Sequence, residues 1–147
     1  MKLTLIDEAT LETLPPLLYY DGRPKDEVPV AFRIFDPSGR YTFFATEGNV
    51  HARNVVGITQ TFTGAQYLAR RDALTLLDVE LFGLAILFEV EYGYASLAEL
   101  QSVRNALGLP LERDLYLFGN TDVTPASVGF TLADAEAYAN RVHRWEP

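Results

Sequence analysis

A long stretch of alternating side chains, from Val79 to Tyr94, constrains the fold more than any other part of the sequence. On an extended strand, one face would carry Leu81, Gly83, Ala85, Leu87, Glu89 and Glu91, and the other, more apolar face would carry Phe82, Leu84, Ile86, Phe88, Val90 and Tyr92. A run that is apolar on both faces is typical of a strand buried within a sheet. We therefore expect a central strand over 79–92, with a bend or bulge near Gly83 or Gly93.

The segment 30–46 predicts an antiparallel hairpin. An alternating stretch leads into Asp-Pro-Ser-Gly at 36–39, which favours a tight turn because proline presets the second position and glycine closes the turn. Aromatic and β-branched residues follow up to Thr46, as expected for the second strand. A further short strand is expected over 114–118.

Three helices are expected beside these strands, over 7–14, 97–107 and 131–143. Each has a polar side chain that can cap its first turn, namely Asp7, Ser96 and Thr131. The region 48–78 is harder to interpret, although 55–62 has strand composition and 64–74 fits a helix. Because strands and helices do not alternate regularly, we predict an α+β fold with a mainly antiparallel sheet in a single domain, 1–147.

Charge and composition narrow the classes of partner. Twelve basic and 20 acidic residues give a net charge of −8, which argues against direct nucleic-acid binding because that binding depends on neutralising phosphates. The acidic surface either keeps the protein solvated or fits a basic groove on a partner. The chain has no cysteine, no signal peptide is recognised, and its most apolar stretch is far shorter than the roughly 20 residues of a membrane span. We expect a cytoplasmic protein without membrane association.

Carboxylates are the candidate reactive groups. Glu89 and Glu91 would point to the same side of one strand, Glu47 ends the hairpin, and Asp114 begins the next strand beside Arg113. If these strands are neighbours, the carboxylates could share a cleft and act as general acid and base or hold a hard cation. Otherwise they are solvated side chains whose ion pairs contribute roughly 0–1 kcal/mol. No P-loop, nucleophile elbow or H-E-x-x-H motif is present, and the sequence predicts no cofactor or metal.

Two motifs stand out in the second half of the chain, E-x-G-Y-x-S-L-x-E-L at 91–100 and G-L-x-x-E-R-D at 108–114. With earlier segments they form an ordered series, over about residues 14–118, that resembles a small bacterial family catalogued only as a domain of unknown function. The resemblance leaves 48–74 as an insertion and 119–147 as a C-terminal helical extension. Such proteins are common on plasmids, phages and integrated elements, which implies an accessory role in host defence or takeover.

These observations support two functions. The first is a non-enzymatic, acidic interaction protein of a mobile element or phage that binds and modulates or inhibits a host protein of transcription or defence. The alternative is a small metal-dependent hydrolase that uses the Glu and Asp cluster. The missing catalytic motifs favour the first, or a plain structural module of a larger complex. The surface expected to carry binding includes Glu47, Glu89, Glu91, Tyr94, Arg113 and Asp114.

Overall fold

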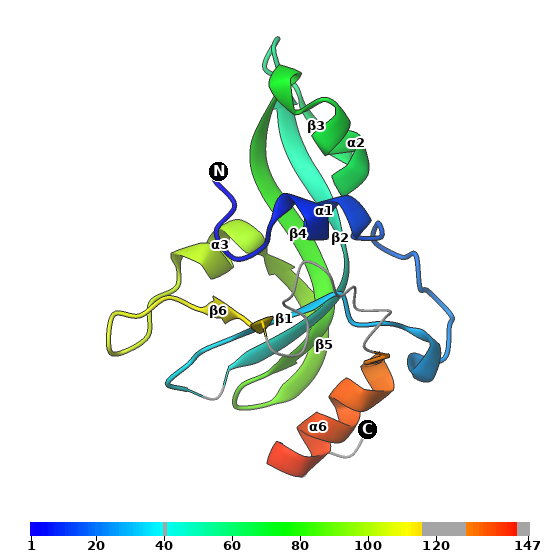
Figure 1. The fold of residues 1–147 in the computed structure, drawn as a ribbon, viewed down its shortest axis with the longest axis vertical. Coiled ribbons are helices and arrows are strands. Elements are labelled where there is room, and N and C mark those ends of the chain that lie inside the picture. Colours follow the sequence, from blue (N-terminus) through cyan, green and yellow to red (C-terminus); the bar gives the residue numbers. More distant parts are fainter. Residues whose placement is uncertain (40, 116–128, 144–147) are drawn as a thin grey trace.

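The computed structural model describes residues 1–39, 41–115 and 129–143, and within these residues it contains a six-stranded antiparallel sheet (Figure 1). The strands are β1 (Phe32–Phe35), β2 (Thr42–Asn54), β3 (Thr59–Phe62), β4 (Leu74–Ile86), β5 (Val90–Ser96) and β6 (Glu112–Arg113). Their order is β5-β4-β2-β1-β6, and β3 pairs with the second half of β2. The predicted α+β class with a mainly antiparallel sheet is confirmed.

The helices in the described ranges are α1 (Glu8–Thr13), α2 (Gly64–Ala69), α3 (Leu97–Ser102) and α6 (Leu132–His143), with two 3₁₀ turns, η1 (Lys25–Glu27) and η2 (Arg71–Ala73). The predicted caps form, because the side chains of Asp7 and Ser96 accept hydrogen bonds from backbone N–H groups of α1 and α3. In the part of the chain that the structure covers, no helix is both long and apolar enough to cross a membrane.

The helix expected over 97–107 is shorter than predicted and ends at Ser102. Beyond it, the side-chain carbonyl of Asn105 accepts hydrogen bonds from the backbone N–H groups of Leu107 and Leu109, at 2.9 and 3.0 Å. These local bonds offer the backbone an alternative to the helix, which explains the early end.

The stretch 79–92 is not one strand, as expected from its alternation, but parts of two. β4 ends at Ile86, and the chain turns back through 87–89 into β5, which pairs with β4 from Val90 onward. The turn contains neither glycine nor proline, and its Phe88 is 92% exposed, so nothing in its composition marks a reversal. The reversal keeps the alternation in phase, because Phe82 pairs with Tyr94 on the same face.

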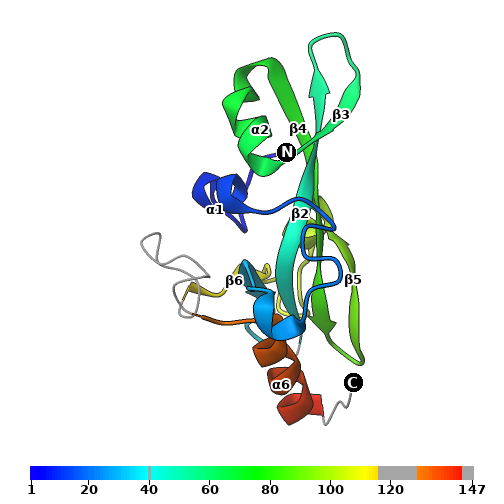
Figure 2. The same cartoon turned by 90° about the vertical axis from the view of Figure 1, so that its right-hand side faces the viewer.

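The two faces of the sheet are covered differently. On the closed face, defined by Phe43, Ala45, Val50 and Leu81, the strands pack against apolar side chains of α1, α2 and α3. Figure 2 shows α1 and α2 on the same side of the long β2–β4 ribbon. On the open face, defined by Phe44, Glu47, Leu84 and Tyr92, a smaller apolar cluster packs against α6. The main core therefore lies between the closed face and the three short helices.

Residues 48–74, expected to be an insertion relative to the family, contribute to this core. They provide the second half of β2, all of β3 and α2, and they bury Val50, Ala52 and Phe62. A Cβ on Gly64 would lie 1.7 Å from the backbone carbonyl oxygen of Leu11, so α2 can approach α1 this closely only with glycine at that position.

Of the short strand expected over 114–118, the two described residues, Asp114 and Leu115, lie outside any strand, and the nearest strand, β6, ends at Arg113. β6 pairs only with Ile34 and Phe35 of β1, and Asp114, just beyond it, directs its carboxylate to Arg33 at 2.9 Å. Residues 116–118 lie outside the described residues. The helix expected over 131–143 is present as α6, with Thr131 hydrogen-bonded to Asp134 at its start.

Candidate functional site

A β-bulge in β2 decides which side of the sheet Glu47 faces. Ala45 lies on the closed face, and strict alternation would place Glu47 beside it. The pairing with β4 instead skips Thr46, so that Ala45 pairs with Gly83 and Glu47 pairs with Phe82. One extra residue therefore turns the Glu47 side chain onto the open face.

Glu47 is buried, with 5% of its surface exposed, and its carboxylate lacks sufficient donors. The Thr46 hydroxyl lies 3.2 Å from Oε1, but it also lies 3.3 Å from the carbonyl oxygen of Phe82. A hydroxyl has one proton and serves one acceptor at a time. Oε2 has no hydrogen-bond partner among the residues that the structure describes. Leaving such a group unsatisfied costs about 1–3 kcal/mol, and more if it is charged.

Glu47 lies in the wall of a pocket of about 290 Å³, which we call the tyrosine pocket. The pocket lies between the open face and the segment 17–25, which precedes β1. This segment is held to β2 near the bulge, because the backbone N–H of Leu17 donates to the side-chain oxygen of Asn49 at 3.1 Å. The aromatic and cationic residues that line the pocket are Tyr20, Arg23, Lys25, Phe82, Tyr92 and Tyr94.

Lys25 and Tyr92 form a fixed part of the wall. The Tyr92 hydroxyl donates to Oε1 of Glu136 on α6 at 2.6 Å, and Nζ of Lys25 lies 2.6 Å from the same oxygen. Nζ of Lys25 also lies 4.9 Å from the centre of the Tyr92 ring. Burial, the hydrogen bond to Glu136 and the charge of Glu136 all raise the pKa of Tyr92, which keeps its hydroxyl protonated. The charge of Lys25 is thus already balanced by the carboxylate of Glu136.

Arg23 and Tyr20 line the same pocket from the segment 17–25. The guanidinium of Arg23 lies 5.5 Å and 5.8 Å from the ring centres of Tyr19 and Tyr20, within the range of a cation–π contact. Burial is the largest cause that raises the pKa of Tyr20, and the nearby Tyr19 and Glu47 raise it further. The charge of Arg23 acts in the opposite direction and lowers the pKa of Tyr20.

Leu18 also lines the pocket and has an uncommon backbone. Its φ is 69°, in the left-handed region that a leucine rarely adopts, and its side chain is 69% exposed. This conformation costs on the order of 1–2 kcal/mol. The backbone N–H of Asp21 donates to the carbonyl of Leu18 at 3.0 Å, which holds the turn. A strained, exposed leucine beside a pocket is typical of a binding surface.

The structure brings together two of the six residues proposed from the sequence. Glu47 and Tyr94 both line the tyrosine pocket, and the Tyr94 ring lies 5.2 Å from that of Phe82. Glu91 pairs with Ala85 on the closed face, opposite to Glu47. Glu47 and Glu91 therefore do not share the cleft that the sequence allowed if their strands had brought them together.

The other three residues lie elsewhere. Glu89 is exposed in the turn between β4 and β5. Arg113 lies on the closed-face side and forms an ion pair with Asp7 at 3.4 Å. Asp114 is 4% exposed and pairs with Arg33. The expected cluster assumed neighbouring strands and a single strand over 79–92, and the hairpin and the strand order separate its members.

Sequence reasoning missed the contribution of the segment 17–25. The Tyr19-Tyr20 pair, Arg23 and Lys25 of this segment were not among the candidate residues. Phe82 and Tyr92 were correctly placed on one face. A usable signal was the break in alternation within 42–50, where the apolar positions change phase at Thr46.

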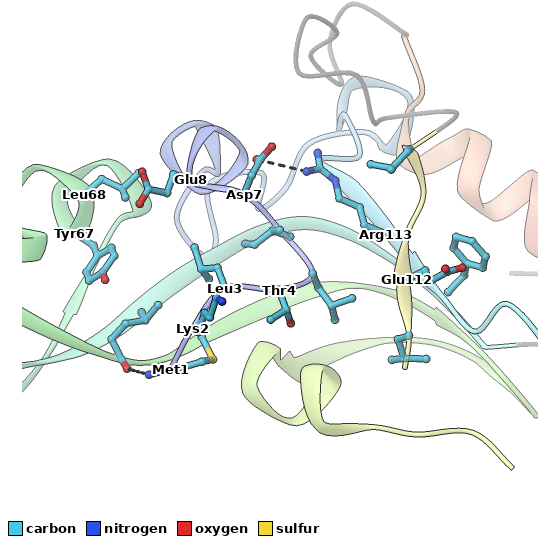
Figure 3. Close-up of a pocket in the computed structure, with 16 residues that line it drawn as sticks. Met1, Lys2, Leu3, Thr4, Asp7, Glu8, Tyr67, Leu68, Glu112 and Arg113 are labelled. Atoms are coloured by element: carbon cyan, nitrogen blue, oxygen red, sulfur yellow. Dashed lines mark hydrogen bonds and ion pairs between the residues drawn. The ribbon is translucent and has the colours of Figure 1, made fainter. Parts of the chain in front are cut away.

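A larger groove, of about 900 Å³, surrounds the N-terminal segment on the closed-face side. Figure 3 shows this segment running between Tyr67 and Leu68 of α2 and Glu112 and Arg113 of β6. The polar groups that the groove contains are largely paired with each other: Asp7 with Arg113, Glu8 with Arg71, and the terminal ammonium with the carbonyl of Leu76. The groove therefore has a structural role in holding the N-terminal segment.

A polar patch on the open face contains the one histidine whose contacts are described. In His51, Nε2 lies 3.0 Å from a carboxylate oxygen of Glu80 and Nδ1 lies 3.2 Å from the hydroxyl of Thr61. Within the described ranges, no group of three or more His, Cys, Asp or Glu side chains is placed to hold a metal ion.

Comparison with known proteins gives a family but no characterised relative. No curated protein and no solved structure matches the chain. The sequence profile of a family described as proteins of unknown function, DUF2958, matches residues 55–136, which is more than half of the chain. The match includes β4, β5, α3 and the first turn of α6, together with Phe82, Tyr92 and Tyr94 of the tyrosine pocket. The chain therefore belongs to the DUF2958 family.

Proposed function

We propose that this protein is a non-enzymatic binding module that attaches to a host protein and modulates it, and that the tyrosine pocket with its rim is the contact surface. The observation that carries the proposal is Glu47, a buried carboxylate whose Oε2 lacks a donor among the described residues and which lines an aromatic pocket. A group of this kind destabilises a protein on its own. A bound partner that donates to it would remove that penalty.

The rim of the pocket supports a protein as the partner. Leu18, Tyr19 and Tyr94 are each more than half exposed, and Tyr19 packs edge-on against Tyr20 at 4.9 Å. Tyrosine and arginine are enriched in protein interfaces, where tyrosine offers a large apolar surface and a polar end. Exposed apolar side chains gathered around a pocket are a common mark of such interfaces.

Charge supports a partner with a basic surface. The net charge of −8 favours encounter with basic proteins and speeds it at low salt. The resemblance to proteins of plasmids, phages and integrated elements points to a host protein of transcription or defence as the target. On this proposal, the module would block or alter the activity of that target.

Affinity purification from the natural host tests the proposal. The tagged protein is incubated with host extract at low and at high salt, and retained proteins are identified by mass spectrometry. We expect one dominant host protein that is released by salt, because screening weakens contacts between charged surfaces. Tyr94→Ala should lose it, since the substitution removes the ring at the pocket rim.

Phe88→Ala is the matched control, because Phe88 is an equally aromatic side chain that is 92% exposed in the turn between β4 and β5. It should retain the host protein. Retention of the same protein by Tyr94→Ala would move the interface away from the pocket. A blank at low salt with the wild-type protein would contradict the proposal as a whole.

A further inference from the structure

We propose that the tyrosine pocket takes a single lysine side chain from the partner protein, with Glu47 as the counter-ion of its ammonium group. This inference rests on the proposed function, since it assigns the chemistry of the group that the same surface would bind. On this inference, the pocket determines which side chain of the partner is recognised. The exposed rim residues Leu18, Tyr19 and Tyr94 add apolar contact area that does not depend on that side chain.

The unsatisfied oxygen of Glu47 needs one charged donor. Oε1 of Glu47 lies within reach of the Thr46 hydroxyl, whereas Oε2 has no partner in the described part of the chain. A guanidinium binds a carboxylate best through two parallel hydrogen bonds in a fork geometry. An ammonium is a compact charge whose three donors need no such fork. A lysine can therefore satisfy Oε2 with a single hydrogen bond.

The aromatic wall suits the same ligand. Tyr20, Phe82, Tyr92 and Tyr94 line the pocket, and ring faces attract cations. One such cation–π contact is present in the pocket wall, where Nζ of Lys25 lies 4.9 Å from the Tyr92 ring centre. The alkyl part of a lysine side chain would bury against the same rings while its ammonium reached the carboxylate.

The cations of the pocket do not cancel the charge of Glu47. Lys25 is neutralised by Glu136 at 2.6 Å, so its charge is already balanced. Arg23 lies against Tyr19 and Tyr20, and Asp21 lines the same pocket. Counting Glu136 with the lining residues, three carboxylates face two cations, and an added ammonium would balance the site.

The first experiment uses a small probe, so that it does not depend on knowing the partner. Nα-acetyl-lysine methylamide is titrated into the 147-residue protein, and backbone and tyrosine ring signals are followed by NMR. The matched probe is the norleucine derivative, which keeps the aliphatic chain and lacks the ammonium. We expect saturable shifts at the tyrosine pocket with lysine, and binding weaker by at least about tenfold with norleucine, because a charged hydrogen bond is lost.

Two variants locate the site. Glu47→Gln removes one negative charge with little change in shape and should weaken lysine binding by at least about tenfold. Glu89→Gln removes the same charge from an exposed turn residue and should leave binding unchanged. The comparison of the two probes on the wild-type protein stands even if Glu47→Gln folds poorly.

Three results would overturn the inference: equal binding of both probes, lysine binding that survives in Glu47→Gln, or saturable binding of sulfate in the pocket in place of lysine. The last would assign the pocket to anions held by Arg23. Capture of a host protein without lysine binding would leave the proposed function standing and remove only this inference. Lysine binding without a captured host protein would support the lysine site and contradict the proposed binding of a host protein.

Discussion

The two faces of the sheet differ in the number of buried polar side chains that they carry and in how those side chains are hydrogen-bonded. The closed face buries almost exclusively apolar side chains under α1, α2 and α3. The buried polar side chains recorded in the described residues are Thr42, Thr46, Glu47 and Asp114, and these contact open-face residues or lie on that face. Arg33 satisfies Thr42 and Asp114 with hydrogen bonds of 2.9–3.3 Å, whereas Oε2 of Glu47 has no partner among the residues that the structure describes. We infer that the closed face supplies stability and the open face supplies recognition.

The largest expected effect is on the closed face. Leu11→Ala removes a side chain that is 0% exposed and packs between α1, α2 and the sheet, so we expect a loss of about 2–5 kcal/mol in the free energy of unfolding. Urea denaturation of the purified variant measures it. Leu107→Ala, at a leucine that is 72% exposed, should change the same quantity by less than about 0.5 kcal/mol. If Leu11→Ala lowered the free energy of unfolding by less than about 1 kcal/mol, packing on the closed face would not be the main source of stability.

An intermediate effect depends on pH. Tyr41 packs against the closed-face core, and burial raises the pKa of its hydroxyl from 10.0 to about 12. Because the pKa is raised in the folded state, the contribution to stability is complete below pH 10.0 and is lost as the pH rises toward 12. We expect about 2–3 kcal/mol to be lost across this window, at about 1.4 kcal/mol per pKa unit. Denaturation at several pH values should show a smaller loss for Tyr41→Phe.

Tyr19→Phe is the control for this experiment, because Tyr19 is 53% exposed. Its alkaline loss of stability should match that of the wild-type protein. If Tyr41→Phe also matches the wild type, the Tyr41 hydroxyl ionises without disturbing the closed face, and that face is less tightly packed than its burial indicates.

The smallest effect is on the open face and has the opposite sign. Glu47→Met replaces the carboxylate by an apolar side chain of similar length, and we expect the free energy of unfolding to rise by about 1 kcal/mol or to stay unchanged. Thermal and urea denaturation measure this change, and the lysine probe should no longer bind. A loss above about 2 kcal/mol would show that Glu47 is a structural residue, which would weaken the contrast between the faces.

Local features of the fold could be predicted from the sequence. The turn at 36–39 and the caps at Asp7 and Ser96 depend on residues within a few positions of each other, and all three form. The apolar face that contains Phe82 and Tyr92 also survives, because a reversal at 87–89 keeps the alternation in phase. Patterns that are decided within one turn or one strand are thus visible in the sequence.

The site depended on features that no local pattern contains. Which carboxylates meet is decided by strand order and by the reversal at 87–89, whose residues resemble those of a strand. The segment 17–25 reaches the pocket because Leu17 and Pro15 hydrogen-bond to residues 49 and 48 of β2, contacts between positions more than 30 residues apart. Glu47, one of the candidates from the sequence, lines the tyrosine pocket, but its neighbours there are not the carboxylates that were considered together with it.

The bulge at Thr46 has a consequence for how this strand can vary in length. From Glu47 to His51, the facing of each β2 side chain depends on that one unpaired residue. Loss of the single codon for residue 46 would remove the unpaired residue, and the glutamate, now directly after Ala45, would still face away from the apolar core. Pairing of Thr46 with Phe82 in a regular ladder would instead turn the glutamate toward that core. The orientation of Glu47 is therefore insensitive to a reading-frame-preserving loss of three nucleotides at this position, but it depends on the register in which β2 pairs with β4.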